Sequence, residues 1–164
     1  MLKENLVLIG NGMAGIRTLE ELLKLDPDQY NITVFGDEPY GNYNRIMLSP
    51  VLASEKTIEQ IILNDEQWYA DHAITLHKGK KVESINRARQ TVTATDGTTV
   101  PYDRLMIATG SVPFILPIPG ADKQGVIGFR DIKDVDIMLD AAKRYRKAVV
   151  IGGGLLGLDR KSVV

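Results

Sequence analysis

The hydrophobic positions of the chain alternate between short continuous runs and helical spacing. Residues 6–9 are all apolar and end at a glycine, which is typical of a strand buried on both faces of a parallel sheet. Apolar residues then recur three and four apart through residues 13–23. Asp26 ends this predicted helix because it precedes Pro27, and proline disfavours helical backbone in the residue before it. Residues 32–35 are β-branched and aromatic, so a second strand completes a βαβ unit.

The pattern beyond this unit is more varied. Gly, Asn, Tyr and Pro concentrate in residues 36–44, which predicts a loop whose length suggests a binding role. Helical pieces are expected within residues 57–71, and a short third strand at residues 74–77. A small antiparallel excursion with a hairpin turn at Asp96 and Gly97 comes next. Its three predicted strands are residues 82–85, 91–95 and 98–102.

The last third of the chain predicts the start of a second domain. A buried strand at residues 105–108 precedes the stretch 113–120, where three prolines and a glycine exclude regular structure. We therefore predict one domain over residues 1–120 and the opening of another over residues 121–164. The fold class is α/β, with a Rossmann-like parallel sheet and the small antiparallel excursion.

Two elements are expected in that second domain. Asp131 is placed to cap a helix that carries basic residues at its end, and residues 148–151 form an apolar run that predicts another buried strand. Without further strands beside it, this strand would have an unpaired edge. We expect such an edge to pack on its own domain or to pair with a second copy in a homodimer.

Composition and charge narrow the function. Of the 164 residues, 44% are hydrophobic and 25% are charged, which is the balance of a soluble globular protein. Neither a signal peptide nor a membrane-spanning run is evident, so a cytoplasmic location is predicted. The net charge of -1 favours neither nucleic acid nor membranes as a partner. Cysteine is absent, and His72 and His77 have no carboxylate or cysteine at metal-ligand spacing, so no metal site is predicted. Redox chemistry would require a bound cofactor.

A glycine fingerprint lies where the first strand ends and the first helix begins. Gly10 permits a tight turn, Gly12 lets the backbone approach a pyrophosphate, and Gly15 lets the helix pack close to the strand. The amides and dipole of the helix N-terminus then favour phosphate. An acidic residue after the second strand is expected to bind a ribose hydroxyl. Asp37 and Glu38 both qualify, and the position of Asp37 is preferred.

A second fingerprint, with Gly152, Gly154 and Gly157, directly follows residues 148–151. One such motif often marks an ordinary turn, but two copies in the same strand–glycine–helix context favour two dinucleotide sites.

The two fingerprints resemble those of the pyridine nucleotide–disulfide oxidoreductase superfamily. Residues 108–113 and 43–49 carry the same resemblance. Within this superfamily, residues 8–15 and 152–158 are most similar to the N-terminal part of the large subunit of NAD(P)H nitrite reductases. Rubredoxin and ferredoxin reductases are slightly more distant. The resemblance implies FAD at the first fingerprint and NAD(P)H at the second. It implies electron transfer from NAD(P)H through FAD to an acceptor.

The resemblance also implies positions for the cofactor contacts. Arg45 would place a fixed positive charge beside the flavin or a phosphate, and Val82 would contact adenine through its backbone, although Val82 is equally well explained as a core residue. No catalytic residue is predicted. The further implied contacts are Met13 and Ala14 on the pyrophosphate, Asn44 and Ser49 beside the flavin, and Thr109 and Gly110 on the pyrophosphate side.

The chain departs from this family in two respects. Disulfide reductases carry cysteine next to the flavin, whereas residues 41–52 have none, so a thiol relay is excluded. Only seven residues follow Gly157, which suggests a truncated chain that is inactive without the rest of its parent enzyme. A rival interpretation is a non-enzymatic module that binds an adenine nucleotide through the first βαβ unit.

Overall fold

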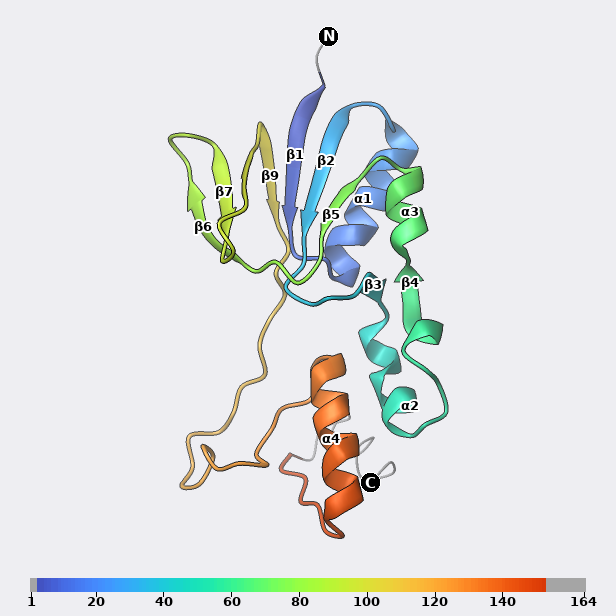
Figure 1. Ribbon diagram of the computed structural model, residues 1–164, viewed down its shortest axis with the longest axis vertical. Coiled ribbons are helices and arrows are strands. Elements are labelled where there is room, and N and C mark those ends of the chain that lie inside the picture. Colours follow the sequence, from blue (N-terminus) through green and yellow to red (C-terminus); the bar gives the residue numbers. More distant parts are fainter. Residues whose placement is uncertain (1–2, 153–164) are drawn as a thin grey trace. The chain divides into compact units, whose positions relative to one another are not determined.

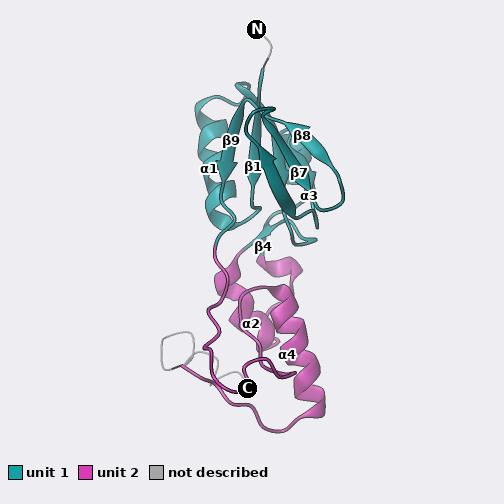
Figure 2. Ribbon diagram, turned by 90° about the vertical axis from the view of Figure 1, so that its left-hand side faces the viewer, with its two compact units in different colours: residues 1–43, 62–110 teal, residues 44–61, 111–164 magenta. Residues whose placement is uncertain are grey.

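The computed structural model describes residues 3–152 and divides the chain into two compact units (Figure 2). The first unit comprises Met1–Tyr43 and Ile62–Gly110, and the second comprises Asn44–Ile61 and Ser111–Val164. Each unit is therefore built from two separate stretches of the chain. The domain boundary near residue 120 stays a prediction.

A four-stranded parallel sheet forms the centre of the first unit (Figure 1). The order of its strands is β5-β2-β1-β9. Leu8 in β1 is in register with Val34 in β2 on one side and Met106 in β9 on the other. The four strands that the apolar runs predicted are confirmed: β1 is Glu4–Ile9, β2 is Tyr30–Phe35, β5 is Thr75–His77 and β9 is Arg104–Ile107.

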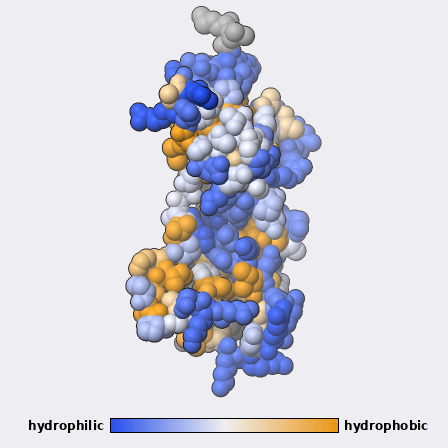
Figure 3. Space-filling model, turned by 60° about the vertical axis from the view of Figure 1, so that its left-hand side comes forward, coloured by the Kyte–Doolittle hydropathy of each residue, from blue (hydrophilic) through white to orange (hydrophobic). Residues whose placement is uncertain are grey.

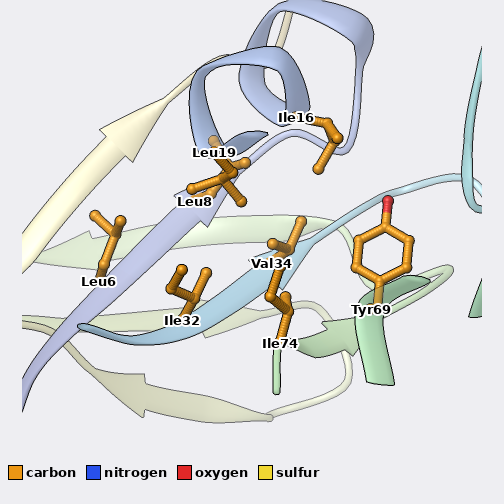
Figure 4. Packing of buried hydrophobic residues seen from close by; sticks show 8 residues of the cluster. All are labelled: Leu6, Leu8, Ile16, Leu19, Ile32, Val34, Tyr69 and Ile74. Atoms are coloured by element: carbon orange, nitrogen blue, oxygen red, sulfur yellow. The ribbon is translucent and has the colours of Figure 1, made fainter. Parts of the chain in front are cut away.

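One face of the sheet is covered by the predicted helix, α1 (Met13–Leu25), which ends at the predicted residue, Asp26. Ile16 and Leu19 of α1 are fully buried against the sheet because the three-residue spacing puts both side chains on one helix face. Figure 4 shows them above the alternate strand residues that point the same way. The same cluster contains Leu6, Leu8, Ile32, Val34, Tyr69 and Ile74.

The opposite face is covered by the predicted antiparallel excursion, whose position on the sheet the sequence did not indicate. It consists of β6 (Val82–Asn86), β7 (Thr91–Ala94) and β8 (Thr99–Pro101), and β7 lies in the middle. Gly97 has φ 86 in the turn between β7 and β8, a conformation that glycine adopts without steric cost. The alternation of β7 buries Val92 and Ala94 completely. Their neighbours in this second cluster include Val7, Ile9 and Phe35 of the parallel sheet.

The predicted loop over residues 36–44 contains a strand that the sequence did not indicate. β3 (Asn42–Tyr43) pairs in antiparallel fashion with β4 (Ile62–Asn64). Its partner lies about twenty residues later, so no local turn signal announces the pair. Helical pieces within residues 57–71 are confirmed as η2 (Glu59–Ile61) and α3 (Glu66–Asp71).

The second unit is mainly helical. It contains η1 (Arg45–Met47), α2 (Leu48–Leu52) and α4 (Ile132–Arg144), and α2 contacts α4. Ile132 and Val135 of α4 are buried. Asp131 caps α4 as predicted, since its side chain accepts a hydrogen bond from the backbone N–H of Asp134. Residues 113–120 contain neither helix nor strand, which agrees with their proline content.

The predicted buried strand at residues 148–151 is wrong. These residues have no regular secondary structure, and Val149 is 87% exposed. A strand forms only where another strand satisfies its backbone groups, and no described strand pairs with this segment. The homodimer that was expected to form through this segment stays a prediction. Figure 3 shows hydrophobic side chains gathered on the surface of the second unit.

Candidate functional site at the carboxyl edge of the parallel sheet

The first fingerprint lies at the point where the order of the parallel strands reverses. From β1 the chain passes through α1 to β2 on one side, and it later returns to β9 on the other side. Gly10 follows the carboxyl end of β1, and Thr109 and Gly110 follow that of β9. In open α/β sheets, ligands bind in the crevice outside the carboxyl ends of strands at such a reversal.

The three fingerprint glycines have different surroundings. Gly10 has φ 111, and a Cβ atom on it would lie 2.6 Å from the carbonyl carbon of Ala108. A Cβ on Gly15 would lie 2.9 Å from the carbonyl oxygen of Gly10 and 3.1 Å from a methyl group of Leu8. A Cβ on Gly12 would meet nothing within 4 Å. Gly10 and Gly15 are thus required by the fold itself, whereas the space at Gly12 is open to a ligand.

No side chain among the described residues caps the N-terminus of α1. Gly12 is the N-cap residue, and the first turn of the helix contains no acidic residue. Met13 is half-buried and Ala14 is exposed in that turn. Since the first amides of a helix have no intrahelical acceptor, this end offers donors and a positive dipole to an anion. Gly12, the uncrowded glycine of the first fingerprint, lies at this helix end, so the surroundings fit an anion such as a pyrophosphate.

The two acidic candidates after β2 differ in their surroundings. Asp37 is exposed, and its carboxylate has no hydrogen bond or ion pair with any described residue. Glu38 is half-buried and accepts a hydrogen bond of 2.7 Å from the hydroxyl group of Tyr43. The carboxylate of Asp37 is therefore the one that is available to a ribose.

The loop after β2 is joined to the segment after β5 by backbone hydrogen bonds. Gly79 N–H donates to the carbonyl of Glu38 at 3.0 Å, and Lys80 N–H donates to that of Gly36 at 2.8 Å. Val82, the first residue of β6, follows two residues later and is half-buried. The structure thus brings the predicted ribose and adenine positions into neighbouring segments of the first unit. Val82 also packs against the core, so both interpretations of this residue remain open.

His77 lies at the end of β5 and stacks on Phe35, with 4.7 Å between the ring centres. Burial lowers the pKa of His77, and the nearby positive charge of Lys80 lowers it further. Neutral imidazole is thus favoured at this edge of the sheet. Among residues 3–152, no group of three potential metal-ligating side chains lies close together.

The predicted flavin-side residues belong to the second unit. Arg45 is half-buried, and its Nη1 donates to the carbonyl of Arg130 at 3.1 Å. The side chain of Asn44 accepts from the backbone N–H of Ile46, which caps η1. Ser49 is buried in α2. The structure therefore brings these three residues together within one unit, separately from the fingerprint in the other.

Three further predicted positions lie in exposed segments. Gly110 has φ 77, and both it and Thr109 are exposed. Gly152 has φ 125, and a Cβ atom on it would meet nothing within 4 Å, in keeping with a turn. Gly154 and Gly157 lie outside the described residues.

Sequence reasoning missed a hydrogen-bonding role of Tyr69. Its ring is buried in the core, and its hydroxyl group donates to Oδ1 of Asn11 at 2.7 Å. Asn11 is the second residue of the fingerprint. Burial raises the pKa of Tyr69 to about 12, so this hydroxyl is neutral and available as a donor. The polar residue at position 11 was the one signal available in the sequence.

The comparisons with known proteins agree with this geometry. The family model described as pyridine nucleotide-disulphide oxidoreductase matches residues 4–162. A nitrite reductase, NAD(P)H-dependent by name, from Bacillus subtilis (strain 168) is 55% identical over 157 residues, which are 96% of this chain and 20% of the relative. An assimilatory nitrate reductase electron transfer subunit of the same strain is 52% identical over 97% of this chain and 21% of the relative.

Among solved structures, NADH:rubredoxin oxidoreductase from Clostridium acetobutylicum superposes with a TM-score of 0.86 at 28% identity. The match covers 99% of this chain and 42% of that one. The chain spans about a fifth of the length of the two curated relatives. None of the helices in the described part of the chain is long and apolar enough to cross a membrane.

Proposed function

The chain belongs to the pyridine nucleotide-disulphide oxidoreductase family, and from this premise we propose that its first unit binds the ADP half of FAD. The observation that carries the proposal is the contrast among the fingerprint glycines. Gly10 and Gly15 are crowded by backbone, while Gly12 faces open space at an uncapped helix end. Neither a close neighbour nor a positive φ requires glycine at position 12, and the open space there would let a ligand approach the helix end.

The cofactor contacts follow from this geometry. The amides of Gly12, Met13, Ala14 and Gly15 would donate to the pyrophosphate. The carboxylate of Asp37 would accept from the ribose hydroxyls, since that of Glu38 is already bonded to Tyr43. Val82 would lie beside adenine, and Thr109 and Gly110 would border the pyrophosphate from the end of β9.

The N-terminus of α4, in the second unit, differs from that of α1 in its charge and in its capping. At the start of α4, Asp131 and Asp134 form a reciprocal capping box, which satisfies its amides and adds negative charge. This helix end repels phosphate, whereas the end of α1 attracts it. In the second unit, Asn44, Arg45 and Ser49 are proposed to contribute to the flavin side. The glycines of the second fingerprint, Gly152, Gly154 and Gly157, are proposed to bind NAD(P)H.

We further assign the chain to an NAD(P)H-dependent flavoprotein reductase of the nitrite reductase type, acting in nitrate assimilation. FAD, when bound, accepts a hydride and passes electrons on, while the protein binds and orients it. The two relatives with more than 50% identity support this assignment. The similarity to the rubredoxin oxidoreductase favours, as a second candidate, a reductase whose acceptor is a small electron-transfer protein.

The test is a titration of the purified chain with FAD, ADP and FMN, followed by flavin fluorescence quenching and calorimetry. We expect FAD and ADP to bind and FMN, which lacks the adenosine half, to bind much more weakly. Binding of ADP with no measurable binding of FAD would instead favour a non-enzymatic adenine-nucleotide module. Failure of both FAD and ADP to bind a folded chain would contradict the proposal.

Gly12→Asp is the sharpest variant. Gly12 has φ -91 and ψ 173 at the N-cap, a position and a backbone conformation that suit aspartate, so the fold should be kept or slightly stabilised. The new carboxylate would occupy the proposed pyrophosphate position and should weaken FAD binding by about 100-fold, or about 2.7 kcal/mol. Thr18→Asp adds the same charge to an exposed position nearly two turns later in α1 and should leave the affinity nearly unchanged.

A further inference from the structure

The side chain of Asn11 joins three segments of the first unit. Its Oδ1 accepts from the Tyr69 hydroxyl at 2.7 Å, and its Nδ2 donates to the carbonyl of Tyr40 at 3.2 Å. It also packs on Gly36, where an added Cβ would lie 2.9 Å from the Cβ of Asn11. The phosphate-binding turn, the loop that carries Asp37, and α3 are thereby linked through one amide group.

The direction of each hydrogen bond is fixed by its neighbours. The backbone N–H of Asn42 donates to the Tyr69 hydroxyl oxygen at 3.3 Å, so the hydroxyl proton must point to Asn11. Asn11 then accepts through Oδ1, which leaves its Nδ2 for the carbonyl of Tyr40. Each of these groups has one compatible role, and the chain of bonds is self-consistent.

A second set of hydrogen bonds connects Asn42 to α1. Nδ2 of Asn42 donates to Oδ1 of Asn64 at 2.8 Å, and Nδ2 of Asn64 donates to Glu20 of α1 at 3.1 Å. In its ionised form the carboxylate of Glu20 accepts hydrogen bonds and donates none. The hydrogen bond from Asn64 keeps the pKa of Glu20 below its usual range. Asn42 and Asn64 are both 3% exposed. The strand pair that presents the Asn42 N–H is therefore fixed to the helix whose N-terminus carries the fingerprint.

We infer that Tyr69 is a positioning residue for dinucleotide binding, which acts through Asn11 to hold the pyrophosphate turn and the ribose loop in register. Its hydroxyl does not need to touch the cofactor. It orients the Asn11 amide, which in turn fixes the loop of residues 36–40 relative to Gly10 and Gly12. This inference rests on the proposed function, because it concerns the same FAD site.

The first test measures affinities for FAD and ADP in Tyr69→Phe. We expect both to fall by the same factor, about tenfold, because the loss lies in the adenosine half of the site. Tyr30→Phe is the matched control. Tyr30 packs against the same core cluster at the opposite end of β2 and should bind both ligands as the wild type does. Wild-type affinity in Tyr69→Phe would overturn the inference.

A double-mutant cycle separates positioning from general destabilisation. If Tyr69 acts through Asn11, Tyr69→Phe should have less than a twofold further effect on ADP affinity in an Asn11→Ala background. If the two effects multiply, Tyr69 acts independently of Asn11 and the inference fails. Asn11→Ala also removes the same hydrogen bond from the other side, so the question can be answered even where Tyr69→Phe does not fold.

Amide hydrogen exchange in the cofactor-free chain gives a readout that does not depend on binding. We expect Tyr69→Phe, but not Tyr30→Phe, to exchange faster at residues 11–12, at residues 36–38 and at Tyr40. Faster exchange confined to Asn42, which loses its own acceptor, would overturn the inference. A wild-type chain that binds neither FAD nor ADP would contradict the proposed function, and the role of Tyr69 in binding with it. Faster exchange over the wider region in Tyr69→Phe would then show only that Tyr69 holds the loop through Asn11.

Discussion

An alanine side chain on Gly10 would overlap the carbonyl oxygen of Ala108, the residue that follows β9. The same turn is tied to the other strands, since Gly10 N–H donates to the carbonyl of Phe35 and Ala108 N–H donates to that of Ile9, both at 2.8 Å. Three parallel strands therefore end within contact of one another at Gly10. The close approach leaves no room for a side chain at the point where the phosphate-binding turn begins.

Gly10→Ala should therefore destabilise the fold before any cofactor is considered. The variant combines a left-handed φ of 111 with a backbone clash, and we expect a loss on the order of 3 kcal/mol or more in the free energy of unfolding. Urea denaturation measures this loss. Gly97→Ala is the control, because Gly97 has φ 86 but open space around it, so it should cost only about 1 kcal/mol. Equal losses in the two variants would show that the clash is relieved cheaply.

The two acidic residues after β2 should differ in their effect on FAD affinity. Asp37→Asn removes the charge of an exposed carboxylate that has no partner among residues 3–152. The affinity should fall by about tenfold, since a hydrogen bond to a charged group contributes about 1.5–3 kcal/mol. Glu38→Gln keeps an acceptor for the Tyr43 hydroxyl and should change the affinity by less than threefold. Fluorescence titration of both variants decides between them, and the reverse order would assign the ribose to Glu38.

The parallel sheet could be predicted because its strands correspond to continuous apolar runs in the sequence. Residues 6–9 and 105–108 need no information from distant parts of the chain to be recognised as buried strands. The same rule failed at residues 148–151, where the apolar pattern is equally strong but no described strand pairs with it. An apolar run indicates that a segment is suited to a buried strand, whereas the strand forms only where a neighbouring strand accepts and donates its backbone hydrogen bonds.

The structural roles of Gly10 and Gly15 were also accessible from the sequence, whereas the approach of a ligand at Gly12 stays a prediction. The spacing of Gly10, Gly12 and Gly15 predicted a turn, an approach and a packing position, and the structure gives Gly10 and Gly15 the crowded surroundings that this requires. The role of Tyr69 was not accessible. It depends on a contact with Asn11, 58 residues away, and on the β3–β4 pair, for which local sequence carries no signal.

The capping box of α4 should stabilise the second unit. Asp131→Ala removes the acceptor for the Asp134 N–H, and we expect a loss of about 1 kcal/mol, seen as faster amide exchange in the first turn of α4. Asp134→Ala should have an added local effect, because its carboxylate accepts from the N–H of Arg130, whose carbonyl binds Arg45. Asp136→Ala, an exposed change in the same helix, is the control. Equal exchange in all three variants would show that the box contributes nothing.

The buried hydroxyl of Tyr69 should make the fold sensitive to alkaline pH. Burial raises the pKa of Tyr69 from 10.0 to about 12. A raised pKa means that the folded chain holds this proton more tightly than the unfolded chain does. The contribution is therefore fully present below pH 10 and is lost as the pH rises toward 12, because the unfolded chain ionises first.

Urea denaturation at several pH values between 9 and 12 tests this sensitivity in the wild type and in Tyr69→Phe. Over that range the wild type should lose on the order of 2–3 kcal/mol more than the variant, with a difference in slope that approaches about 1.4 kcal/mol per pH unit. Tyr69→Phe starts from a lower stability at neutral pH, since it loses the bonds to Asn11 and Asn42, so the comparison uses slopes rather than absolute values. Tyr30→Phe serves again as the control and should follow the wild-type slope. Parallel curves for the wild type and Tyr69→Phe would mean that the hydroxyl ionises in the folded chain as easily as in the unfolded one, which is incompatible with a buried donor that fixes Asn11.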